Sequence, residues 1–395
     1  MSVCHDFLSL SNAADGAQEC DITSLLEMLG KVKDRRKARG KIYELVFILA
    51  VSVVAVLAGA SNFRQIADQA ADLPQSLLRK LGAKWCHFRC MYRWPSERTI
   101  RRVLEDNIDA DELDLLIGTW LRERARRDAE GTMVLAFDGK VVRGAWTDEN
   151  DQFTLFSAMI HGKGVTVAQV RVPQGTNEIT QVEALLDGVL ARAGERVVVT
   201  MDAAHTQRDT AEYLKGKRGF DYVMTVKGNQ PKLLESVVGK CLPLVRQSPD
   251  HVVEERGHGR ISRWSTWVTD AAGIDFPHVL QAGCIRREVF TVTGVRISRE
   301  YAWVVTSGAA ADLGSVDLHE HVRGHWGIEN KIHYVRDTAW LEDGHQIYTG
   351  SGPQVMATLR NLAMGLLRLN GFNAVKETTE WICRDRSRVL PLLAT

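Results

Sequence analysis

Three acidic residues in this sequence stand where a divalent-cation site could form. Asp138 follows the apolar run "TMVLAF" and Asp202 follows "RVVVTM", so each carboxylate ends a stretch typical of a buried strand. If these strands are neighbours in an open α/β sheet, the carboxylates converge at its functional edge, and a cation must offset their repulsion. Glu329, in the helical stretch "HWGIENKIHYVRD", is the candidate third ligand. Two aspartates and a glutamate could hold two Mg²⁺ or Mn²⁺ ions for chemistry on phosphates.

The same residues also have simpler interpretations. Asp138 and Gly139 after an apolar run are a common hairpin-turn signal. A single helical glutamate such as Glu329 is usually a surface residue. Its neighbours instead indicate a packed helix, because four of them are apolar or aromatic: Trp326, Ile328, Ile332 and Tyr334.

A different metal site would use the histidines that flank the glutamate. His325, Glu329 and His333 are spaced by four residues and share one helical face. Such a set could hold zinc for a hydrolase. This alternative explains neither Asp138 nor Asp202, and the metal content of the purified protein would separate the two hypotheses.

Basic residues near the acidic ones could contact phosphate oxygens. Lys140 and Arg143 come directly after the first aspartate, and Lys227 follows a later strand that should end at the same sheet edge. Arg260 and Trp264 begin a β-rich stretch, where the arginine could hold a phosphate and the tryptophan could stack on an unpaired base. The ordinary alternatives are surface charges and, for the tryptophan, core packing.

A second group of basic residues lies before residue 130, where the pattern is helical. In "PSERTIRRVLEDN", Ser96 is a good N-cap for a helix. Arg98, Arg101 and Arg102 lie on its first turns. Arginines on a helix next to a short turn suit a DNA groove or backbone, and a plain surface helix is the alternative.

Composition sets broad limits on the protein class. The chain has 395 residues with 50 Lys and Arg against 49 Asp and Glu, a net charge of +1, so any nucleic-acid surface must be a local patch. Seven irregularly spaced cysteines indicate reduced thiols in a cytosol. The N-terminus lacks a signal-peptide pattern, and the apolar run 45–60 is too short for a membrane span, so we expect it to be a buried helix.

The elements that would position the acidic residues begin at about residue 131. Strands are expected at 132–138, 152–162, 164–172, 196–202 and 220–226, with helices at 180–194 and 206–217. This order predicts an α/β fold with a mixed sheet. Further β-rich pieces between about 229 and 321 interrupt the pattern like an inserted subdomain, and the chain then becomes helical again.

Several motifs together resemble the DDE transposases of bacterial insertion sequences, in the branch of the H-repeat-associated proteins of Rhs elements. The matching stretches are "FDGKVVRG", "MDAAHTQ", "TVKGNQP", "HGR" and "HWGIEN", with "DRRKARGK", "AVLAGASNF" and "PSERTIRR" before them. His325 and Arg336 stand where the family often has an arginine and a lysine. At these positions we expect them to contact DNA.

The resemblance implies a ribonuclease-H-like catalytic domain with Asp138, Asp202 and Glu329 as the triad that binds two Mg²⁺ or Mn²⁺ ions. It implies cleavage and strand transfer of double-stranded DNA at the element ends, by a homodimer assembled on DNA, in the cytoplasm at the nucleoid. The expected domains are a helical, DNA-binding N-terminal domain over residues 1–130, a catalytic core over 131–228 and 322–395, and a β-rich insertion over 229–321. The alternative is an inactive DNA-binding remnant, although all three carboxylates are present.

Overall fold

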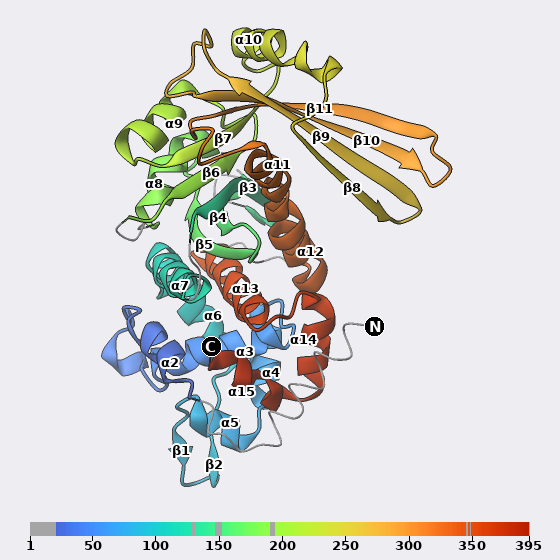
Figure 1. Cartoon of the computed structure of the whole chain (residues 1–395). Coiled ribbons are helices and arrows are strands. Elements are labelled where there is room, and N and C mark those ends of the chain that lie inside the picture. The colour runs from blue at the N-terminus through green and yellow to red at the C-terminus, as the bar shows by residue number, and fades with distance from the viewer. Residues whose placement is uncertain are drawn as a thin grey trace.

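Helices and one short hairpin precede the first long strand (Figure 1). The structure is a computed structural model that describes residues 21–127, 131–146, 152–189, 194–344, 347 and 349–394. The helices of this N-terminal region are α2 (Thr23–Gly30), α3 (Leu45–Leu57), α4 (Phe63–Ala71), α5 (Gln75–Lys80), α6 (Glu97–Asp106) and α7 (Ala110–Ala125). The hairpin strands β1 (Trp85–Cys86) and β2 (Met91–Tyr92) project from the end of this region in Figure 1.

Helix α3 is the centre of the helical region. Its sequence is apolar on all sides, and every residue except Val46 is buried. It packs against α2, α4 and the C-terminal helix α13 (Gly352–Leu369). The expected buried helix is therefore confirmed, and no helix in the described ranges is long and apolar enough to cross a membrane.

A nine-stranded sheet follows, in the order β5-β4-β3-β6-β7-β11-β10-β9-β8. Its first strands are β3 (Met133–Trp146), β4 (Gln152–Ile160), β5 (Val165–Arg171), β6 (Val197–Met201) and β7 (Asp221–Val226). The helices between them are α8 (Val182–Asp187) and α9 (Arg208–Ala211), the latter continued by the π-helical segment η3 (Glu212–Lys217). Strands β3, β6 and β7 are parallel, whereas β4 and β5 are antiparallel to their neighbours. This confirms the predicted mixed α/β arrangement.

The β-rich stretch extends the same sheet. After α10 (Pro231–Cys241) come β8 (His251–Gly257), β9 (Arg260–Asp270), β10 (Gln281–Thr291) and β11 (Arg296–Thr306). The end of β11 pairs with β7 through the register Trp303–Val226 to Thr306–Val223. The outer ends of these strands reach far beyond the rest of the sheet (Figure 1). Pairing along the open edge of β7 thus makes this stretch continuous with the sheet rather than a separate one.

The C-terminal region joins the sheet to the helices. It contains α11 (Ser315–His325), the π-helical turn η5 (Glu329–His333), α12 (Tyr334–Trp340), α13, α14 (Val375–Arg384) and α15 (Leu390–Leu393). Helix α13 is almost wholly buried and packs against α3, α7 and β5 (Figure 1). Together with α7, which also packs on β5, it couples the helical region to the sheet.

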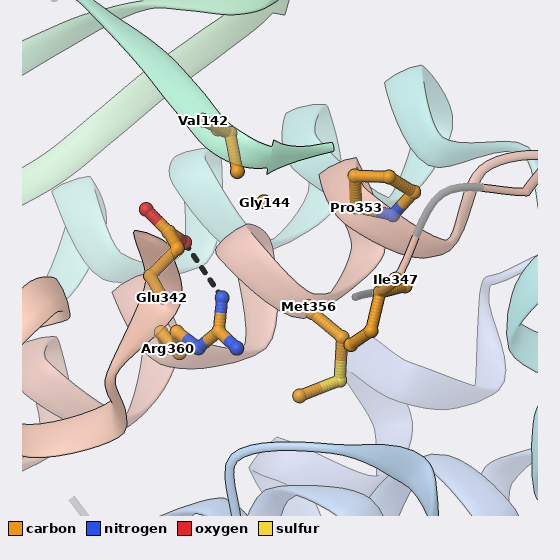
Figure 2. Close-up of a pocket in the computed structure, with 7 residues that line it drawn as sticks. All are labelled: Val142, Gly144, Glu342, Ile347, Pro353, Met356 and Arg360. Atoms are coloured by element: carbon orange, nitrogen blue, oxygen red, sulfur yellow. Dashed lines mark hydrogen bonds and ion pairs between the residues drawn. The ribbon is translucent and has the colours of Figure 1, made fainter. Parts of the chain in front are cut away.

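Two arginines and a glutamate form a buried ion-pair group beneath the sheet. Glu342 bonds Arg336 at 2.7 Å and Arg360 at 2.6 Å, and all three are almost fully buried. Figure 2 shows the Glu342–Arg360 pair beside the small pocket lined by Val142 and Met356. Burial alone would raise the pKa of Glu342, but the guanidinium charges outweigh it and lower the pKa to about 2. The expected DNA contact of Arg336 does not fit this position, because the side chain is inaccessible and already paired.

Candidate active site

Asp138 and Asp202 occupy matching positions on neighbouring parallel strands. The last pair of the β3–β6 register is Ala136 with Thr200, and each aspartate lies two residues further along its own chain segment. Burial first, and then the charges of Glu178 and Asp202, raise the pKa of Asp138 to about 7. The structure therefore brings the two predicted aspartates together at one edge of the sheet.

The strand does not end at Asp138, contrary to the sequence prediction. β3 continues to Trp146, and Asp138 pairs with Ser157 on β4 while Gly139 pairs with Phe156. The Asp-Gly pair is therefore not a hairpin turn either. It is instead the pairing with β6 that stops just before Asp138, and the charge of Asp202, in the loop after β6, acts on the Asp138 carboxylate.

The loop after β6 holds Asp202 in a fixed orientation. Its Oδ1 accepts hydrogen bonds from the backbone N–H groups of Ala204 (3.1 Å) and His205 (3.3 Å). The hydroxyl of Thr206 donates to the carbonyl of Thr225 at 2.6 Å, which ties this loop to the end of β7. The ends of β6 and β7 therefore form one rigid edge.

The segment that carries Glu329 crosses this edge. Nδ1 of His325 lies 3.0 Å from the hydroxyl of Thr200, and Nδ1 of His333 lies 3.4 Å from Oδ2 of Asp138. Glu329 lies midway between the two histidines in sequence, and its side chain is exposed. In the described ranges no three His, Cys, Asp or Glu side chains are grouped closely enough to hold a metal ion. The structure thus joins Asp138 and Asp202 and leaves the carboxylate of Glu329 facing solvent nearby.

The zinc alternative finds no support in this geometry. His325 and His333 turn to different partners, Thr200 and Asp138.

Burial lowers the pKa of His325 to about 4 and that of His333 to about 3, so both rings are neutral at pH 7. His325 is half-buried and neutral, so its expected contact with DNA, which stays a prediction, would not be an ion pair with a phosphate.

Of the four apolar or aromatic side chains expected to pack around Glu329, two are buried. Ile328 and Ile332 are buried, whereas Trp326 and Tyr334 are 58% and 63% exposed. The apolar side chains therefore anchor this segment on the sheet. The two aromatic side chains face solvent on either side of the glutamate in sequence.

Two residues of the site were not predicted from the sequence. Glu178, the first residue of the short 3₁₀ helix η2 (Glu178–Gln181) before α8, raises the pKa of Asp138, and its Oε2 lies 3.4 Å from Nε2 of His205. His205 is buried, and its ring stacks on Phe156 with centroids 5.0 Å apart. The signal that could have found Glu178 is the polar stretch "TNEIT" between a strand and a helix. His205 lies three residues after Asp202 in "MDAAHTQ", so its place beside the second aspartate could have indicated it.

The basic residues near the site have different environments. Lys140 is buried and pairs with Asp337 at 2.8 Å and Asp343 at 3.3 Å, so its expected phosphate contact does not fit. The side chain of Arg143 is 80% exposed, and Lys227 is exposed directly after β7 at the edge of the site. Lys227 could therefore reach a phosphate at this edge. Arg143 lies five residues beyond Asp138 on β3 and 3.8 Å from Asp343, so its phosphate contact stays a prediction.

Arg260 and Trp264 lie along the sheet extension. Arg260 is exposed at the start of β9. The part of β9 that is level with the β7–β11 pairing begins seven residues later, at Trp267, so Arg260 lies about 23 Å from it along the strand. The Trp264 ring is half-buried, with the guanidinium of Arg323 at 4.1 Å and that of Arg287 at 5.8 Å from its centroid. These contacts match the packing alternative for Trp264 and leave its stacking on a base a prediction.

The predicted helix of the N-terminal arginines is α6, with Ser96 directly before it. Arg101 forms ion pairs with Glu97 at 2.7 Å and Glu105 at 3.3 Å along this helix. Arg98 and Arg102 are exposed. Arg98 and Arg102 are therefore more available than Arg101 for a contact with DNA phosphates.

Comparison with known proteins places the chain in a family. The model of the transposase DDE domain matches residues 130–366, and the model of the DDE_Tnp_1-associated region matches residues 26–121. The YncI protein of Escherichia coli O157:H7, named as a transposase, is 28% identical over 88% of this chain and 88% of its own length. YhhI of E. coli (strain K12), named as H repeat-associated, is 26% identical over 88% of this chain and 91% of its own.

A solved structure gives a weaker likeness. The piggyBac transposase in a synaptic complex with hairpin DNA aligns with 97% of this chain and 81% of its own, at 10% identity and a TM-score of 0.37, too low to define a shared fold. The family assignment rests on the sequence matches. By these matches the chain belongs to the transposase DDE family, in the branch of the H-repeat-associated proteins, and it is a DNA transposase.

Proposed function

We propose that this transposase cleaves and joins DNA strands at the ends of its insertion sequence through Asp138, Asp202 and Glu329, which hold two Mg²⁺ or Mn²⁺ ions. The observation that carries the proposal is the matching position of the two aspartates, with the Glu329 segment fixed on the same edge by His325 and His333. The substrates are double-stranded element ends and target DNA. The active form is a homodimer assembled on DNA.

The donor chemistry of this edge fits magnesium or manganese. Carboxylate oxygens are preferred ligands for these ions. The raised pKa of Asp138 reflects burial and neighbouring carboxylates, an unfavourable charge that a cation would offset. Nε2 of His333 is also buried without a hydrogen-bond partner among the described residues, so the site contains an unsatisfied polar group. Bound ions would activate water, or later a 3′-hydroxyl, and stabilise the leaving oxygen.

The other residues of the site orient the carboxylates or bind the DNA. The N–H groups after Asp202 hold its carboxylate in place before substrate arrives. The neutral ring of His333 contacts Asp138 without adding a competing positive charge. Arg143 and Lys227 hold phosphates of the DNA end, and Arg98 and Arg102 on α6 bind DNA further away.

The same proposal extends to the architecture. The strand order β5-β4-β3-β6-β7, with three parallel strands and an antiparallel pair at one side, supports a ribonuclease-H-like core. Residues 1–130 form the DNA-binding domain in this scheme, and residues 229–321 form an insertion that contacts the DNA end. Exposed Arg260 near the outer end of the sheet extension suits such a contact.

Strand cleavage in vitro tests the proposal. DNA carrying the sequences that flank the gene should be nicked at the element ends in Mg²⁺ or Mn²⁺ and left intact in chelator, with no covalent protein–DNA link. Asp202→Asn should abolish cleavage and preserve binding, because an amide of the same shape is a poor ligand. Full cleavage in chelator, or by Asp202→Asn, would contradict the proposal. Binding without cleavage by the wild type would favour an inactive remnant.

A further inference from the structure

A third carboxylate stands against the paired aspartates. Gly139 follows Asp138 on β3, and a Cβ built at Gly139 would overlap the carboxylate of Glu178. The charge of Glu178 is also the first electrostatic cause of the raised pKa of Asp138, ahead of Asp202. The absence of a side chain at Gly139 therefore makes room for the carboxylate of Glu178. Because β3 continues through Gly139 without a turn, a turn conformation does not explain the glycine at this position.

A buried histidine faces this carboxylate from the other side. His205 is 1% exposed, and its Nε2 lies 3.4 Å from Oε2 of Glu178. Its Nδ1 has no hydrogen-bond partner among the described residues, and stacking on Phe156 fixes the ring plane. The backbone N–H of the same histidine donates to Asp202. One residue thus contacts both the second aspartate and Glu178, as residues that orient metal-binding carboxylates commonly do.

We propose that Glu178 is an additional carboxylate ligand of the divalent-cation site formed by Asp138 and Asp202, and that His205 positions it. The three carboxylates are not grouped closely enough for a metal as they stand, so a bound ion would draw them together. This inference rests on the proposed function. It differs from that function in assigning a carboxylate that comes from the 3₁₀ helix η2 before α8, whereas Glu329 comes from η5. The side chain of Glu178 is 31% exposed, so an ion from solvent can reach its carboxylate. Uncompensated carboxylates side by side are costly, and a shared cation is the usual remedy.

The test measures Mn²⁺ binding by the full chain without DNA, from the paramagnetic resonance signal of free Mn²⁺ during titration. Glu178→Gln keeps the shape of the side chain and removes its charge, and it should weaken Mn²⁺ binding about 10- to 100-fold. Gly139→Ala leaves Glu178 intact but displaces its carboxylate, so it should weaken binding by a similar factor. Combining the two substitutions should add little to either one, because both remove the same ligand.

The matched control is Glu183→Gln, five residues further along on α8, where the side chain is 62% exposed. This variant should bind Mn²⁺ like the wild type, and circular dichroism should give the same folded spectrum for all variants. If Gly139→Ala does not fold, Glu178→Gln alone decides. Binding lost in Asp138→Asn but kept in Glu178→Gln would overturn the role of Glu178 and leave the proposed function standing. No binding by the wild type would contradict both.

Discussion

Oδ2 of Asp138 lies 3.4 Å from Nδ1 of His333, so the segment that carries Glu329 is anchored on the strand that carries the first aspartate. Removing this anchor should reduce cleavage by about tenfold, because Glu329 is then held less well. His333→Ala should show the loss in kcat more than in KM for end DNA. His333→Asn, which keeps a polar group at this position, should recover some of the rate. Equal rates for wild type and His333→Ala would exclude a positioning role for His333.

The raised pKa of Asp138 predicts a pH-dependent cost to stability. The ordinary pKa is 3.8 and the folded value is about 7, so between these values the folded state keeps a proton that the unfolded chain has released. Raising the pH through this window therefore favours unfolding. In chelator, the Tm of the wild type should fall relative to that of Asp138→Asn as the pH rises from about 4 to about 7. Mg²⁺ should reduce the difference, and parallel melting curves would contradict the shift.

The buried ion-pair group predicts a large effect on stability. Glu342→Gln leaves the guanidinium groups of Arg336 and Arg360 in the interior without a counter-charge. The free energy of unfolding in urea should fall by about 3–5 kcal/mol. Glu377→Gln, at an exposed position on α14, should leave it within about 0.5 kcal/mol of the wild type. A similar small effect for both variants would mean that the buried group does not stabilise the fold.

The three arginines of α6 should differ in DNA binding. Arg98→Ala and Arg102→Ala should each weaken binding to end DNA and lower the magnitude of its salt slope by about 1, since each removes one phosphate contact. Arg101→Ala should have a smaller effect because its charge is shared with Glu97 and Glu105. Titration of labelled DNA at several salt concentrations measures this. An unchanged slope in all three variants would place the DNA elsewhere.

The sequence predicted the sheet well because its strands are strongly apolar. The order of elements from β3 to β7 and the convergence of Asp138 and Asp202 follow from the runs before each aspartate. The end of β3 was predicted too early, since a polar residue beside a glycine is a turn signal in isolation. In the structure the glycine instead makes room for Glu178.

Long-range pairing was less predictable. Nothing in the sequence shows that Arg360 meets Glu342 in the interior or that Lys140 meets Asp337. Arg336 and Glu342 are six residues apart, a spacing that matches no helical pairing pattern. Basic residues next to an acidic motif favour a phosphate contact when only the sequence is known. Glu178 was missed for a related reason, because it comes from a short 3₁₀ helix, η2, whose position depends on the packing of β5 and α8.

In the proposed chemistry Glu329 completes the site of Asp138 and Asp202, and the cleavage rate of Glu329→Gln measures its contribution. Glu320→Gln is the matched control, because Glu320 is also exposed and lies on the preceding helix α11. With end DNA in Mn²⁺, Glu329→Gln should bind like the wild type but lose about 10³-fold or more in cleavage, as loss of a metal ligand requires, while Glu320→Gln should cleave normally. Wild-type cleavage by Glu329→Gln would contradict the assignment of the triad.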